Sequence, residues 1–323
     1  MIQGVTRQIS LADILKLVPA ERVGPDVSIQ ALHYADGKSA YERILTFAAA
    51  PKYLRAATLN PKVRVIVTRP ELVNGLDAEL RGRFTFLLTA EPVSFFFELH
   101  RRLYNETDFY PRIGSPPKMG RGCSIDPLAV IERDVVIGDN VAIGPYTVVR
   151  RGTLIDDKVG IGANSVIGAS GFELKYVNGS LSHVPHAGGV RIGKGVGIGS
   201  NTVIGRSLFE GYTVIGPETH IDNSVHISHE VSIGARTILC AGVNVAGSVS
   251  IGDDVFIGIG ALVNNKISIG NRARVNMGAV VAQSVPDHAN VAGFYAMPNS
   301  MWIAKTLQDQ RSFGLANTPK GTT

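Results

Sequence analysis

The chain has 323 residues, 45% of them hydrophobic and 18% charged, and a formal net charge of +5. This composition excludes a disordered, highly charged chain, and no apolar run approaches the roughly 18 residues of a membrane span. The two cysteines, Cys123 and Cys240, show neither a disulfide framework nor metal-type spacing, and the first residues lack the apolar core of a signal peptide. We therefore expect a cytoplasmic protein without a metal site. The positive charge favours acidic partners, but it is spread along the chain and so does not indicate nucleic-acid binding.

Residues 1–115 predict a separate mixed α/β domain. The segment ISLADILKLV (9–18) has the pattern of an amphipathic helix, VRVIVT (63–68) that of a buried strand, and SFFFELHRRLY (94–104) that of a second helix. A linker rich in Pro and Gly, PRIGSPPKMGRG, follows at 111–122.

A six-residue repeat dominates the next part of the chain, residues 120–285. An aliphatic residue occupies every sixth position from Ile125 to Ile167, from Ile192 to Ile204, and from Ile215 to Val281, and Gly often follows it. A period of six fits neither a helix nor a simple strand, but it fits short strands joined by tight turns, with Gly where the backbone turns. Three such faces close a coil of eighteen residues, and stacked coils predict a mainly β protein built on a parallel β-helix.

Residues 286–323 predict a C-terminal helical extension and tail. Asn299 is placed to cap a helix covering roughly 300–312. Because the ends of a solenoid must be covered, we expect the N-terminal domain and this helix to act as lids.

The segment HIDNSVHISHEVSIG (220–234) is the polar-rich patch of the repeat. Residues eighteen apart should stack about one strand spacing (~4.8 Å) apart, which sets Gly247 beside His229 and Asn244 beside His226. A histidine next to a glycine has space at its ring and exposed backbone N–H groups nearby. Attack on a thioester needs such a base and such an oxyanion donor.

Two simpler interpretations compete with catalysis. A lone surface histidine is usually just solvated, and this remains the favoured interpretation for His220 and His226. A zinc site would need three ligands from neighbouring coils. No histidine or carboxylate stacks at 244 or 247, so we expect no metal.

The sequence resembles the UDP-3-O-acylglucosamine N-acyltransferases of lipid A biosynthesis, within the hexapeptide-repeat acyltransferase superfamily. The resemblance rests on the ISLADIL start, ILTFAAAPKY (44–53), the interruption ASGFELKYVNGSLSHVPHAGGVRIG (169–193), IDNSVHISHEVSIG, VAGSVSIG and MPNSMWIAK. It implies a left-handed β-helix, since the family has that hand. It also implies roles for individual residues: Phe47 and Tyr53 would hold the uracil, His229 would be the catalytic base and Gly247 the oxyanion donor. Asp222 would be a catalytic companion, and Asn223 and His226 would bind substrate.

The reaction implied by the resemblance is transfer of an acyl group, typically 3-hydroxyacyl, from an acyl carrier protein thioester to the amine of a UDP-linked amino sugar. We expect no tightly bound cofactor, and we expect the protein to form a homotrimer. Ala50 stands where the family commonly has Asn, and Lys266 where it commonly has His. These departures leave a second interpretation open, an acyl-CoA-dependent N-acyltransferase of another nucleotide-linked amino sugar. A non-catalytic scaffold that has kept the solenoid is a third.

Overall fold

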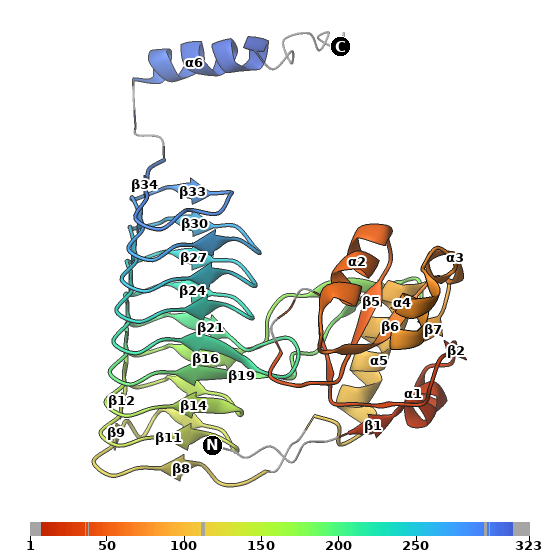
Figure 1. Ribbon diagram of the computed structural model, residues 1–323. Coiled ribbons are helices and arrows are strands. Elements are labelled where there is room, and N and C mark those ends of the chain that lie inside the picture. The colour runs from red at the N-terminus through yellow and green to blue at the C-terminus, as the bar shows by residue number, and fades with distance from the viewer. Residues whose placement is uncertain are drawn as a thin grey trace, which may run out of the picture.

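The structure is a computed structural model that describes residues 8–35, 37, 39–110, 114–293, 296 and 298–312. The predicted tail beyond residue 312 and the first seven residues lie outside this range. An α/β unit stands beside a long column of stacked coils, and a helix follows the last coil (Figure 1).

The N-terminal unit is a five-stranded sheet with the strand order β2-β7-β6-β5-β4. Its strands are β2 (Glu21–Val23), β4 (Ala31–Leu32), β5 (Ile44–Ala48), β6 (Val63–Thr68) and β7 (Thr85–Leu88). Its helices are α1 (Leu11–Leu17), α2 (Pro51–Leu59), α3 (Pro70–Asn74), α4 (Ala78–Arg83) and α5 (Pro92–Glu106), and a small pair joins β1 (Ile9–Ser10) to β3 (Ser28–Ile29). The three segments expected as helix, strand and helix are indeed α1, β6 and α5.

The column has three parallel faces, which the chain visits in turn. Sheet I contains β9 (Ser124–Ile125), β12 (Ala142–Ile143), β15 (Gly160–Ile161), β20 (Gly197–Ile198), β23 (His220–Ile221), β26 (Ile238–Leu239), β29 (Phe256–Ile257), β32 (Arg274–Val275) and β34 (Asn290–Val291). Sheet II contains β10 (Val130–Ile131), β13 (Val148–Val149), β16 (Val166–Ala169), β21 (Val203–Gly205), β24 (His226–Ile227), β27 (Asn244–Val245), β30 (Leu262–Val263) and β33 (Val280–Val281). Sheet III contains β8 (Lys118–Met119), β11 (Val136–Ile137), β14 (Thr153–Ile155), β19 (Gly189–Ile192), β22 (Tyr212–Ile215), β25 (Ser232–Ile233), β28 (Ser250–Ile251) and β31 (Ser268–Ile269). This arrangement is the left-handed parallel β-helix, and it confirms the predicted fold class.

The aliphatic repeat forms the core of the column. Every repeat position is buried except Ile125 and Ile131 in the first coil, which are partly buried. Stacked coils keep the inward residues in register, as in the pair Ile227 and Val245. Burial of one branched side chain per face stabilises the coil by about 1.5–3 kcal/mol per residue.

The repeat glycines have a different role from the one expected. Gly138 and Gly234 are not in the left-handed region, which is occupied at the corners by residues such as Asn140 (φ 57°) and Lys158 (φ 60°). A Cβ atom on Gly138 would lie 2.8 Å from the backbone nitrogen of Asp157, and one on Gly234 would lie 2.6 Å from a backbone carbon of the next coil. Glycine is therefore required by close stacking of the coils rather than by the turn.

Two excursions from the column hold the N-terminal unit in place. The first carries the hairpin β17 (Leu174–Val177) and β18 (Ser180–His183), and the second spans 206–211. Phe209 of the second excursion is fully buried against Tyr34, Phe96 and His100 of the N-terminal unit. The expectation that this unit covers an end of the solenoid is wrong, because these contacts fix it beside the coils (Figure 1).

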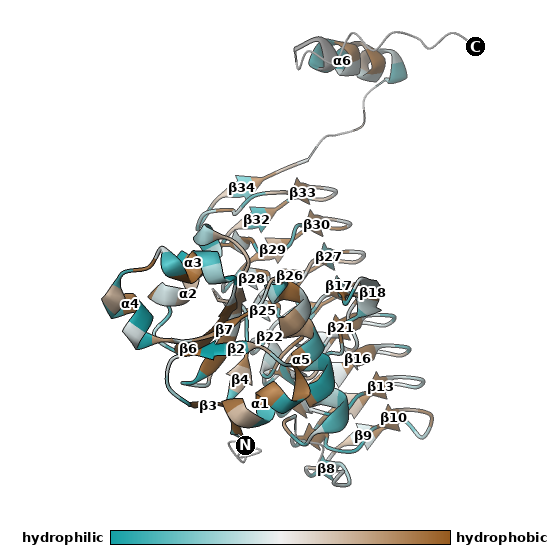
Figure 2. Ribbon diagram, turned by 90° about the vertical axis from the view of Figure 1, so that its right-hand side faces the viewer, coloured by the Kyte–Doolittle hydropathy of each residue, from teal (hydrophilic) through white to brown (hydrophobic). Residues whose placement is uncertain are grey.

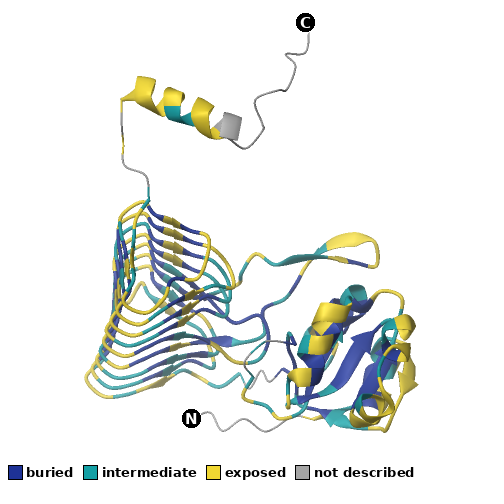
Figure 3. Ribbon diagram, turned by 45° about the horizontal axis from the view of Figure 1, so that its top comes forward, coloured by how far each residue is buried: buried dark blue, intermediate teal, exposed yellow. Residues whose placement is uncertain are grey.

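The C-terminal helix α6 (Asn299–Ser312) matches the predicted helix closely. It follows the last coil, and most of its described surface is exposed, whereas the inner strands β5 and β6 of the N-terminal sheet are mostly buried (Figure 3). Hydrophobic and hydrophilic residues alternate around it (Figure 2). Met301, Ile303 and Leu307 are each about half exposed.

Candidate active site

His229 lies at the corner between sheets II and III, just after β24. The next coil brings Gly247 against its ring: a Cβ atom there would lie 2.8 Å from both Cε1 and Nε2 of the imidazole. The backbone N–H of Ser248 donates to the carbonyl of His229 at 2.9 Å, which locks the two coils together. On the preceding coil the neighbour is Gly205. Gly211, eighteen residues before His229, does not stack on it, because it belongs to the second excursion.

The backbone of Gly247 is a suitable hydrogen-bond donor. Ala246 and Ser248 on either side donate their N–H groups to carbonyls of neighbouring coils. Within the described part of the chain, no group accepts a hydrogen bond from the N–H of Gly247. A donor of this kind beside an imidazole is what an oxyanion hole requires.

Two carboxylates flank the imidazole, one near each nitrogen. Glu230 Oε2 lies 3.6 Å from Nδ1, and Glu173 Oε2 lies 3.8 Å from Nε2. The ring of His186 stands edge-on to that of His229, with centroids 5.3 Å apart. Burial lowers the pKa of His186 to about 4, so this neighbour is neutral at physiological pH.

Glu230 is the carboxylate beside Nδ1 of His229, a buried atom that makes no hydrogen bond in the described part of the chain. Burial pushes its pKa upward, but His229, the positive charge of His33 and the Ser248 hydroxyl outweigh that effect and leave the pKa below 4.5. The Ser248 hydroxyl donates to Glu230 Oε2 at 3.1 Å and fixes its position. An ionised Glu230 beside Nδ1 favours the tautomer with the proton on Nδ1, which leaves Nε2 free to act as a base.

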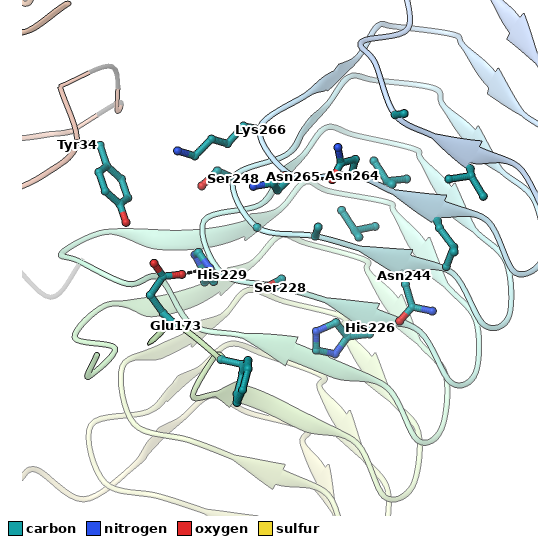
Figure 4. A pocket seen from close by; sticks show the side chains of 18 of the residues that line it. Tyr34, Glu173, His226, Ser228, His229, Asn244, Ser248, Asn264, Asn265 and Lys266 are labelled. Atoms are coloured by element: carbon teal, nitrogen blue, oxygen red, sulfur yellow. Dashed lines mark hydrogen bonds and ion pairs between the residues drawn. The ribbon is translucent and has the colours of Figure 1, made fainter. Parts of the chain in front are cut away.

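A cavity of about 760 Å³ opens in front of Nε2 (Figure 4). Sheet II contributes His226 and Asn244, and the later coils contribute the apolar side chains of Leu262 and Val280. The N-terminal unit contributes Tyr34, whose ring lies 5.1 Å from the Nζ of Lys266. Burial lowers the pKa of His226, so a neutral, polar ring lines the lower wall.

The residues predicted on the column divide into two groups. His229, Gly247 and His226 share the cavity. The eighteen-residue pairings of Gly247 with His229 and of Asn244 with His226 are confirmed. Asp222 and Asn223 do not: they lie at the preceding corner, between sheets I and II, and Asp222 borders a separate hollow of about 680 Å³. Asn223 Oδ1 accepts from the backbone of Ser200 at 2.7 Å and stabilises the stacking of that corner. Within one chain Asp222 does not line the cavity of His229, because one face of the coil separates them. Its role as a catalytic companion stays a prediction.

The two aromatic residues predicted to hold uracil lie in the N-terminal unit and do not line the His229 cavity. Phe47, in β5, packs its ring 4.7 Å from Phe96. Tyr53, on α2, is about half exposed, and the Nζ of Lys52 lies 4.8 Å from its ring. Their role in base binding stays a prediction.

Three site residues were missed at the sequence level: Tyr34, Glu173 and Glu230. Glu230 could have been found, since it is adjacent to His229 in the patch already singled out. Tyr34 and Glu173 come from a loop of the N-terminal unit and from an excursion, where no period relates residue number to position.

Among the described residues, no group of three or more His, Cys, Asp or Glu side chains is arranged to hold a metal ion. None of the helices in the described part of the chain has the length and apolar character to span a membrane.

Family comparison matches parts of the column. Residues 116–151 match the bacterial transferase hexapeptide (six repeats), and residues 134–169 and 248–283 match the hexapeptide repeat of succinyl-transferase. These parts of the column therefore carry hexapeptide repeats similar to those of bacterial transferases. A search of curated proteins finds no match.

Several solved structures have similar coils. The UDP-N-acetylglucosamine acyltransferase of Campylobacter jejuni is 21% identical over 62% of this chain and 77% of its own, with a TM-score of 0.49. The enzyme of that name from Bacteroides fragilis is 21% identical over 66% and 84%, with a TM-score of 0.49, and the one from Arabidopsis is 24% identical over 64% and 82%, with a TM-score of 0.41.

Proposed function

We propose that the protein transfers an acyl group from a thioester to the amine of a UDP-linked amino sugar, such as UDP-3-O-acylglucosamine. The observation that carries the proposal is the contact between the His229 imidazole and Gly247, which lines the same cavity and whose N–H has no acceptor in the described part of the chain. Hexapeptide repeats of the transferase type and the sequence resemblance support the same reaction class.

In this reaction His229 removes a proton from the acceptor amine through Nε2. The neutral amine attacks the thioester carbonyl, and the N–H of Gly247 donates to the oxyanion of the tetrahedral intermediate. Glu230 stabilises the imidazolium that forms, since it lies 3.6 Å from Nδ1. The nitrogen of the tetrahedral intermediate loses its second proton, the thiol leaves with a proton from His229, and the amide product is released.

The walls of the cavity support both substrates. Leu262 and Val280 offer an apolar surface for the acyl chain, while His226 and Asn244 offer hydrogen-bonding groups for the sugar. Phe47 and Tyr53 remain the candidate residues for stacking on the uracil.

The donor is either an acyl carrier protein thioester or an acyl-CoA, and we favour the carrier protein. The net charge of +5 suits an acidic protein partner, which electrostatic attraction would steer to the site. Either donor fits the cytoplasmic setting expected from the sequence.

We further propose a homotrimer. The cavity lies on the outside of a single column, and α6 holds Met301, Ile303 and Leu307 half exposed beyond the last coil. Neighbouring copies would cover both surfaces. Asp222 and Asn223, too far around the coil to serve their own His229, would then be able to reach the cavity of a neighbour.

Mass spectrometry of transfer reactions tests the proposal. Purified full-length protein is incubated with UDP-3-O-acylglucosamine and with matched acyl-carrier-protein and acyl-CoA donors. We expect the acceptor to gain one acyl mass, with the carrier protein as the better donor. Transfer from acyl-CoA alone would support the second interpretation, and no product with any donor or amino-sugar nucleotide would overturn the proposal.

A further inference from the structure

Glu173 occupies a place in the cavity that the reaction described above does not use. Its carboxylate lies 3.8 Å from His229 Nε2, too far for a hydrogen bond between them. A nitrogen atom lying about 2.9 Å from both atoms fits this separation. Among the described residues that line the cavity, Glu173 is the acidic one, and its carboxylate points toward His229 (Figure 4).

We propose that Glu173 binds the ammonium form of the acceptor and accepts its second proton, so that the enzyme selects an amine over a hydroxyl. This inference rests on the proposed function and names the acceptor chemistry of the same site. It makes Glu173 a catalytic residue that touches the acceptor nitrogen.

The excursion holds Glu173 firmly for this task. The backbone N–H of Val184 donates to the carbonyl of Glu173 at 2.9 Å, which ties the two sides of the excursion together. Lys175 Nζ lies 2.6 Å from Glu173 Oε1, and the same ammonium group lies 5.4 Å from the centre of the Phe97 ring. Lys175 therefore anchors one carboxylate oxygen and leaves Oε2 directed at His229. The side chain of Glu173 is only 17% exposed, so little water competes for it.

Other charged groups at the cavity do not suit this role. Lys175 and Lys266 are cations, which repel an ammonium group. Glu230 lies on the far side of the imidazole, beside Nδ1, and is occupied by the Ser248 hydroxyl.

The number of protons lost in the reaction explains why a second proton acceptor is useful. An amine that enters as R–NH₃⁺ must lose two protons to become an amide nitrogen. His229 takes the first, the free amine forms the C–N bond, and Glu173 takes the second from the tetrahedral intermediate. The C–S bond then breaks, His229 returns its proton to the thiolate, and Glu173 releases its proton to water. A hydroxyl acceptor carries one proton and no positive charge, so it needs only His229.

The test compares two acceptors in Glu173→Gln, which keeps the size of the side chain but cannot bind or deprotonate an ammonium group in this way. The acceptors are UDP-3-O-acylglucosamine and its analogue with a hydroxyl in place of the amine. We expect kcat/KM for the amine to fall about 10²-fold or more, and the rate with the hydroxyl analogue to change less than tenfold. Glu218→Gln makes the same chemical change at an exposed corner and should match the wild type with both acceptors.

Each other outcome overturns the inference. If the wild type transfers acyl groups and Glu173→Gln behaves like Glu218→Gln, the proposed function stands and the role of Glu173 falls. An equal loss with both acceptors would assign Glu173 a structural role instead. If the wild type transfers to neither acceptor from either donor, the proposed function fails and this inference fails with it.

Discussion

His229 owes its properties to residues brought beside it by the stacking of coils. Gly247 leaves room for the ring, Glu230 lies 3.6 Å from its Nδ1, and the Ser248 hydroxyl holds Glu230 in place. The stacking of two coils therefore sets these three residues around the imidazole.

Gly247→Ala tests this arrangement. The new methyl group would lie within 2.8 Å of two ring atoms of His229 and must displace the imidazole. We expect kcat to fall about 10²-fold, because a displacement of about 1 Å has effects of that size, while circular dichroism shows an intact fold. At Gly160, on sheet I, no atom lies within 4 Å of the Cβ position, so Gly160→Ala is the matched control. Equal activity of the two variants would contradict the proposed geometry.

The regular coils and the two excursions differ in how far the sequence predicts them. The period of six locates the strands, their inward residues and the neighbours of His229, because each coil repeats the same geometry. An excursion has no repeat, so residue numbers do not predict where its side chains contact the column. Those contacts are set by packing. Phe209 and Glu173 were missed for this reason, and Tyr34 was missed because it lies on a loop of the N-terminal unit, outside the repeat. The role of the glycines was misread because stacking contacts lie between coils rather than along the chain.

Glu210, in the second excursion, makes stability depend on pH. Burial raises its pKa to about 8, and no group in the described part of the chain hydrogen-bonds its Oε2. The folded chain keeps a proton that the unfolded chain releases above about 4.5, so the free energy of unfolding falls as pH rises from about 4.5 to 8.

Glu210→Gln should remove this penalty. We expect its melting temperature to exceed that of the wild type by roughly 5 °C at pH 8, and by much less at pH 5. Glu21→Gln, at an exposed position of β2, provides the control and should show no such trend. A difference that is the same at both pH values would show that ionisation of Glu210 does not contribute.

At the scale of the whole molecule, the candidate site of a single chain lies on the outside of the column. The residues predicted for it lie at two different corners of the coil. Sequence spacing could not anticipate this division, because Asp222 and His229 are only seven positions apart yet belong to different corners of the coil. The resemblance implied that both act together. An assembly of neighbouring columns reconciles the two observations.

Light scattering of the full chain tests that assembly. We predict a particle three times the 34.4 kDa mass of one chain. A monomer at the concentrations used for activity assays would contradict the trimer and would leave Asp222 without a role at the cavity.

The central claim is that His229 is the base of an acyl transfer, and its removal tests this most directly. We predict that His229→Ala lowers the initial rate of transfer roughly 10² to 10⁴-fold without changing the fold measured by circular dichroism. His288→Asn, which keeps a residue tolerant of its φ of 61°, is the control and should retain the wild-type rate. A loss below tenfold in His229→Ala would contradict the account.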